Sequence, residues 1–177
     1  MGELWVFGYG SLMWRPGFPV AAAAPGLLKG AHRSLCVISI FHRGTREQPG
    51  LVLGLDRGGA CRGTVYRVAP GAEEETVAYL RTREQVTDVY VEAYRPVRIL
   101  DGSGITVKAL TYLVDHNHEQ YAGVLAPEAL LSLVSQGQGR SGTNIDYVLS
   151  TAKELRTMGL RDSVLDWLVE RISESRG

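Results

Sequence analysis

The sequence is short of cysteine, of net charge and of long apolar runs. Its 177 residues include two cysteines, and 19 Lys plus Arg are balanced by 19 Asp plus Glu. The cysteines match no CxxC or zinc-ligand spacing, so we expect Cys36 and Cys61 to be buried thiols rather than disulfide or metal ligands. Without a positive excess or a basic run, a nucleic-acid-binding protein that works through bulk charge is not predicted.

No segment approaches the roughly 20 consecutive apolar residues that a membrane-spanning helix needs. Residues 1–8 have no basic region, no long apolar stretch and no small-residue cleavage site of a secretory signal. We therefore expect a cytoplasmic protein without membrane insertion.

Histidine is also scarce, and its four copies are not spaced as metal ligands. His32, His42, His116 and His118 form no HExxH or similar pattern. No serine lies in a GxSxG nucleophile elbow. Neither a metal site nor a serine hydrolase is predicted.

The order of elements predicts an α+β fold in one domain over residues 1–177. Short segments rich in β-formers come first, bounded by glycine turns, and suggest a small barrel or strongly curved sheet. Four helical segments follow or interrupt them, three of these from about residue 127 onward. The predicted strands are 4–7, 35–41, 51–55, 64–68, 89–100 and 105–114, and the predicted helices are 70–84, 127–134, 144–158 and 161–173.

The first candidate site is the turn Gly8-Tyr9-Gly10-Ser11 after the first predicted strand. Glycine tolerates positive φ and close approach of a ligand to the backbone. Successive N–H groups in such a turn can bind a carboxylate, a phosphate or a developing oxyanion. A plain turn at a strand end explains the same residues equally well.

A second glycine pattern, GxGxxG, occupies residues 137–142. A dinucleotide-binding loop must follow a strand and open a helix within a βαβ unit. Here the pattern follows a predicted helix, so we expect a loop between helices.

The third candidate is Glu84, at the end of the predicted helix 70–84. At about 100° per residue, Val77, Leu80 and Glu84 fall on one face, which should pack on the sheet. A carboxylate on that face would have a raised pKa and could serve as a general acid/base. Alternatively, the last turn frays and Glu84 lies in solvent or pairs with Arg81 or Arg83.

The residues around these candidates resemble the ChaC-type γ-glutamylcyclotransferases. The opening segment 5–18, Trp-Val-Phe-Gly-Tyr-Gly-Ser-Leu-Met-Trp-Arg-Pro-Gly-Phe, is very similar to the start of that family. The likeness continues in the same order over nearly the whole chain, through residues 42–45, 49–52, 79–84, 112, 117–123, 139–144 and 147.

This resemblance implies a small mixed β-barrel with flanking helices and a reaction without metal or organic cofactor. It implies that Glu84 is the catalytic acid/base and that five residues bind the γ-glutamyl group: Tyr9, Gly10, Ser11, Leu12 and Tyr121. The sequence departs from the family in two places. Ala122 replaces the leucine of many relatives, and the segment 85–89 has Asp88 in place of the expected glycine-containing loop.

The implied activity converts the γ-glutamyl group of glutathione to 5-oxoproline and releases cysteinylglycine. One alternative keeps this chemistry with γ-glutamyl amino acids or γ-glutamylamines as substrates. Another is a non-catalytic regulator of a cation transporter. The presence of Glu84 and of the whole glycine loop favours an enzyme, because an adaptor needs neither.

Overall fold

The structure is a computed structural model that describes residues 2–177. The chain divides into two compact units, which are described separately here. Unit 1 comprises Met1–Ser34 and Gly54–His118, and unit 2 comprises Leu35–Leu53 and Glu119–Gly177. The single domain expected from the sequence stays a prediction.

Five strands form a closed barrel in the order β1-β3-β2-β4-β5. Antiparallel pairs make most of this sheet, and a parallel pair joins β1 to β5, with Trp5 opposite Ala109 and Val6 opposite Leu110. The mixed β-barrel expected from the sequence is therefore confirmed. The strands are β1 Trp5–Gly8, β2 Val20–Ser39, β3 Gly50–Val68, β4 Tyr90–Ile99 and β5 Thr106–Val114.

Two of these strands are much longer than the sequence predicts. The predicted strands 51–55 and 64–68 are parts of one continuous strand, β3. Gly58 and Gly59 have φ of +92° and +69°, so they mark an irregularity inside this strand and not a turn between two strands. β2 begins at Val20, in an alanine- and glycine-rich stretch without a β-propensity signal.

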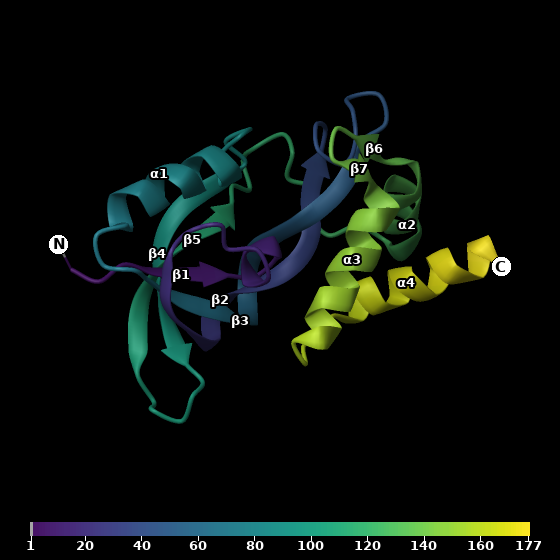
Figure 1. Cartoon of the computed structure of the whole chain (residues 1–177). Coiled ribbons are helices and arrows are strands. Elements are labelled where there is room, and N and C mark those ends of the chain that lie inside the picture. The colour runs from purple at the N-terminus through teal and green to yellow at the C-terminus, as the bar shows by residue number, and fades with distance from the viewer. Residues whose placement is uncertain (1) are drawn as a thin grey trace. The chain divides into compact units, whose positions relative to one another are not determined.

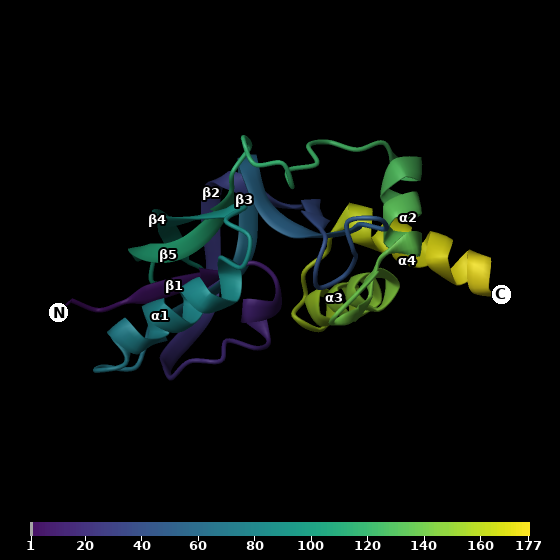
Figure 2. The same ribbon diagram turned by 90° about the horizontal axis from the view of Figure 1, so that it is seen from above.

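Helix α1, Glu73–Glu84, packs along unit 1. Figures 1 and 2 show it running beside the barrel strands, close to β1. Its inward side chains include Leu80, which is fully buried in a cluster with Val6 and Leu110. The predicted start at residue 70 was three residues early, because Gly71 has φ +87° and leaves helical geometry.

Unit 2 contains the last three helices (Figure 1). They are α2 Pro127–Gln136, α3 Asn144–Thr157 and α4 Ser163–Arg176, close to the predicted ranges. Between α2 and α3, the GxGxxG segment forms a small hairpin of β6 Gln138–Gly139 and β7 Gly142–Thr143. A Cβ at Gly139 would lie 2.6 Å from the backbone of Gly44 and His42, so close packing explains this glycine. Among the described residues, no helix is long and apolar enough to cross a membrane.

Both cysteines are reduced and inaccessible. Cys36 lies on β2 and is 0% exposed, and Cys61 lies on β3 and is 3% exposed. The expectation of buried thiols is confirmed.

Unit 2 depends on a buried amide that links α3 to β3. The Nδ2 of Asn144 donates to the carbonyl of Leu51, and its Oδ1 accepts from the N–H of Leu51, each at 2.7 Å. Asn144 is 0% exposed, so water cannot replace either bond. The side chain pairs with Leu51 as a neighbouring strand would.

We predict that Asn144→Ala lowers the free energy of unfolding by about 2–4 kcal/mol, because it leaves two buried backbone groups without partners. The exposed Asn117 provides a matched control. We expect Asn117→Ala to change the free energy by less than about 0.5 kcal/mol. Urea denaturation of the three proteins measures both values, and equal losses in the two variants would contradict the role of Asn144.

Candidate active site

The segment after β1 carries four of the predicted binding residues and is held by side chains of two strands. It contains a short 3₁₀ helix, η1, Ser11–Met13. From β2, the Nε of Arg33 donates to the carbonyl of Tyr9 at 2.6 Å. From β3, the hydroxyl of Tyr66 donates to the carbonyls of Leu12 at 2.9 Å and Met13 at 2.7 Å. These carbonyl groups of the turn are thereby satisfied and held in place.

A third residue, Arg83 of α1, also holds the turn through hydrogen bonds. Its Nη1 donates to the carbonyl of Arg15 at 2.6 Å, and its Nη2 donates to the Oγ of Ser11 at 2.8 Å. Arg83 directly precedes Glu84 in α1. The structure therefore connects the predicted binding turn to the residue beside the predicted acid/base.

Glu84 is the last residue of α1, and its side chain is 17% exposed. Burial raises the pKa of its carboxyl group, and the charge of Arg83, with Nε 3.5 Å from Glu84 Oε1, acts in the opposite direction. The alternative of a frayed, solvated last turn is wrong. The alternative pairing with Arg81 is also wrong, because Arg81 binds Glu92 through two hydrogen bonds of 2.8 and 2.9 Å. The alternative pairing with Arg83 is the one that the structure contains.

Tyr112 on β5 carries part of the family resemblance but was not predicted as a site residue, and its hydroxyl is influenced by the charge of Glu84. Its ring is buried, and its hydroxyl lies 3.4 Å from Glu92 Oε2, to which it donates. Burial and the nearby charges of Glu92 and Glu84 raise the pKa of Tyr112. The phenol therefore remains protonated and can only donate to the carboxylates around it at neutral pH.

The backbone of the turn differs from the expectation at Gly10. Its φ is −132°, so this glycine does not use the positive φ that glycine tolerates. The N–H of Met13 bonds to the carbonyl of Gly10 at 2.9 Å, which closes the turn as η1. The N–H groups that open a helix have no acceptor within it and are the groups that can meet an anion.

The two remaining sequence features have clear positions. Tyr121 belongs to unit 2, where it forms a bridge with Val37 of β2.

Asp88, in the segment after Glu84, has φ +55°. That left-handed conformation favours glycine and is tolerated by Asp, so this position can adopt it without glycine.

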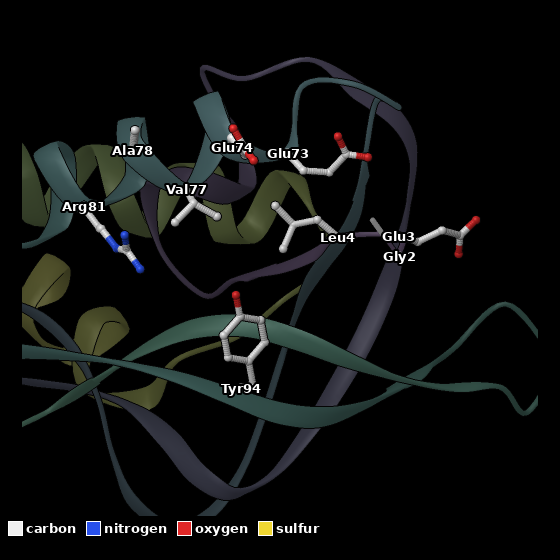
Figure 3. A pocket seen from close by; sticks show the side chains of 9 residues that line it. All are labelled: Gly2, Glu3, Leu4, Glu73, Glu74, Val77, Ala78, Arg81 and Tyr94. Atoms are coloured by element: carbon white, nitrogen blue, oxygen red, sulfur yellow. The ribbon is translucent and has the colours of Figure 1, made fainter.

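A separate pocket of about 480 Å³ lies at the other end of α1 (Figure 3). Figure 3 shows Leu4, Val77 and Tyr94 facing its interior, with Glu3 and Glu73 at its edge. None of the predicted site residues lines it. The carboxylate of Glu3 is 62% exposed and paired with Arg67, so it lacks the burial of Glu84.

Among residues 2–177, no group of three or more His, Cys, Asp or Glu side chains is arranged to hold a metal ion. What the site does offer is a buried carboxylate with a raised pKa beside a turn fixed by hydrogen bonds. A carboxyl group whose pKa is raised by burial is suited to exchange a proton with a bound molecule.

The chain is similar to proteins with known names over most of its length. The model of a family described as ChaC-like protein matches residues 4–175. The glutathione-specific γ-glutamylcyclotransferase of Escherichia coli strain K12 is 33% identical over 173 residues, which cover 98% of this chain and 74% of the relative. The glutathione-specific γ-glutamylcyclotransferase 1 of Homo sapiens is 32% identical over 158 residues, covering 88% of this chain and 71% of the relative.

The fold is also found in a solved structure. The crystal structure of a γ-glutamyl cyclotransferase specific to glutathione from yeast superposes with a TM-score of 0.86. The match covers 98% of this chain and 97% of the yeast chain at 21% sequence identity. This likeness supports the barrel with flanking helices.

The raised pKa of Glu84 predicts a pH-dependent effect on stability. The folded protein keeps this proton over a pH range in which the unfolded chain has lost it, so stability falls as pH rises through that range. Glu84→Gln removes the ionisable group and with it this loss. We expect the variant to melt a few degrees above the wild type at about pH 8, and the difference to shrink toward about pH 4.5.

Thermal unfolding followed by circular dichroism at both pH values measures this effect. Glu74→Gln, at an exposed position of the same helix, is the control and should show no such pH-dependent difference. A melting-temperature difference for Glu84→Gln that is the same at both pH values would contradict the effect of burial.

Proposed function

The chain belongs to the ChaC-like protein family, and on this premise we propose that it is a glutathione-specific γ-glutamylcyclotransferase. The observation that carries the proposal is the buried carboxyl of Glu84, whose pKa is raised by burial, next to the turn that Arg83 fastens. The names of the bacterial and vertebrate relatives support glutathione as the substrate.

In this reaction the substrate attacks itself. The α-amine of the γ-glutamyl group forms a bond to its own γ-carbonyl carbon, and the amide bond to cysteinylglycine breaks. The products are 5-oxoproline and cysteinylglycine. Because the nucleophile is already tethered, the enzyme mainly has to hold the substrate in a folded, attacking conformation.

We propose that Glu84 moves the protons. As a carboxylate it takes a proton from the α-ammonium, which cannot attack while charged. As a carboxylic acid it then returns the proton to the leaving nitrogen. Burial raises the pKa of this carboxyl group, which favours the protonated form that the second step needs.

The turn Tyr9–Leu12 is proposed to bind the γ-glutamyl group. Its first N–H groups and the hydroxyl of Ser11 are donors suited to a carboxylate or to the oxyanion of the tetrahedral intermediate. Tyr121 is proposed as a further substrate contact on the basis of the family resemblance. A metal or organic cofactor has no part in the proposed chemistry.

We also propose a cytoplasmic location. Cys36 and Cys61 are buried thiols, as is usual for proteins of a reducing compartment. γ-Glutamyl amino acids and γ-glutamylamines remain the alternative substrates. The non-catalytic regulator has less support, because a buried carboxylate with a raised pKa has a use in catalysis and none in an adaptor.

We predict that the purified protein releases 5-oxoproline from glutathione and that Glu84→Gln lowers kcat by at least about 100-fold while substrate still binds. The loss follows because Gln can neither take nor return the proton. Chromatographic measurement of 5-oxoproline gives the rate, and calorimetric titration with glutathione gives the binding.

Glu74→Gln, at an exposed position ten residues earlier in the sequence, is the matched control and should keep the wild-type rate. γ-Glutamylalanine as a second substrate tests specificity and should react more slowly. Wild-type turnover in Glu84→Gln would show that Glu84 is not the acid/base. A folded wild type that releases no 5-oxoproline from either substrate would favour the regulator.

A further inference from the structure

The guanidinium group of Arg83 has an acceptor opposite each of its nitrogens. Nη1 donates to the carbonyl of Arg15 at 2.6 Å and to the hydroxyl of Tyr79 at 2.9 Å. Nη2 donates to the Oγ of Ser11 at 2.8 Å. Nε faces Glu84 Oε1 at 3.5 Å. The Arg83 side chain is 20% exposed, and its bonds to Ser11 and Arg15 lie at the protein surface.

The contact with Ser11 determines what the serine hydroxyl can do. Arginine has only donors, so the Ser11 oxygen must be the acceptor in this bond. The hydroxyl proton of Ser11 then points away from Arg83 and is available to another acceptor. The positively charged guanidinium that donates to this oxygen also polarises the O–H bond, which strengthens the hydrogen bond that the hydroxyl donates to an anion.

The surrounding residues hold the guanidinium in place. Tyr79 lies one helical turn before Arg83 on α1, and its hydroxyl occupies the space next to Gly17. A Cβ at Gly17 would lie 2.1 Å from this hydroxyl, and Gly17 has φ +74°. The backbone at Gly17 can therefore lie this close to the Tyr79 hydroxyl of α1 only because residue 17 is glycine.

We propose that Arg83 is a positioning residue that makes the Ser11 hydroxyl a dedicated hydrogen-bond donor to a carboxylate of the substrate, at a fixed place relative to Glu84. This inference rests on the proposed cyclotransferase function and extends it. Arg83 itself does not touch the substrate. A planar fork is needed, because the acceptors on Ser11, Arg15 and Tyr79 lie in different directions and a lysine ammonium cannot span them.

The test is a double-mutant cycle on 5-oxoproline release from glutathione, with Ser11→Ala, Arg83→Lys and the double variant. We expect each single change to lower kcat/KM by about 10- to 100-fold. Most of the loss should be in KM, because the lost bond is one that the bound substrate already makes. The kcat/KM of the double variant should be at most about threefold below that of the less active single variant. Both changes remove the same hydrogen bond, the one that the Ser11 hydroxyl donates to the substrate.

The control is Arg171→Lys, on an arginine that makes an exposed pair with Glu174 on α4, and it should leave both kinetic constants unchanged. A merely structural role for Arg83 would reduce the fraction of active enzyme, which lowers kcat and leaves KM alone. Losses that multiply in the double variant, or an Arg83→Lys enzyme with wild-type KM, would overturn the proposal.

If circular dichroism shows that Arg83→Lys does not fold, Tyr79→Phe replaces it in the same cycle. That change removes one acceptor of the guanidinium and leaves Ser11 intact, and we expect a smaller rise in KM that disappears in the Ser11→Ala background. An unchanged KM, or a rise that persists in that background, would overturn the proposal. A folded wild type without 5-oxoproline release would overturn the proposed function and this inference together, whereas an active wild type with independent losses overturns only the inference.

Discussion

The geometry of the candidate site depends on how the turn after β1 satisfies its backbone. A turn at a strand end has no neighbouring strand to pair with, so its carbonyl groups need side-chain donors. Here Arg33, Tyr66 and Arg83 supply these donors from β2, β3 and α1. Since each donor belongs to a different element of unit 1, the turn is positioned by the closed barrel and its helix together. A turn held in this way can bind a substrate with little rearrangement of its own backbone.

Glu84 is in a different situation, because its contact with Arg83 Nε is a long one of 3.5 Å. Its neighbour Arg83 makes its shortest hydrogen bonds to the turn, and Arg81 makes its hydrogen bonds to Glu92. The carboxyl is therefore buried without a short hydrogen bond from either arginine. This arrangement raises its pKa and costs stability, as is common where a protein keeps a group ready for proton transfer. The same helix thus carries one arginine that organises the loop and one carboxyl that stays available.

The sequence predicted the features that arise from local patterns. The hairpin of β4 and β5 follows from a short glycine-rich turn. The spacing of Glu84 to Val77 and Leu80 indicated an inward orientation as one of two alternatives, and the pattern alone did not decide between them. The anchors of the turn could not be found in this way. Arg33 and Tyr66 lie 24 and 54 residues from the carbonyls they bind, and nothing near them in the sequence indicates the partner. The length of β3 was missed for a similar reason, because its pairing continues through Gly58 and Gly59, which read as a turn.

The burial of both cysteines has a consequence for an enzyme with the proposed activity. Glutathione is the reductant that protects protein thiols in a cell, and a catalyst that consumes it removes its own protection as it works. An accessible thiol would become exposed to oxidation when turnover is greatest. Cys36 and Cys61, at 0% and 3% exposure, are out of reach of oxidants and of mixed-disulfide formation. The two thiols are therefore protected by burial even when the proposed reaction lowers the glutathione concentration around the protein.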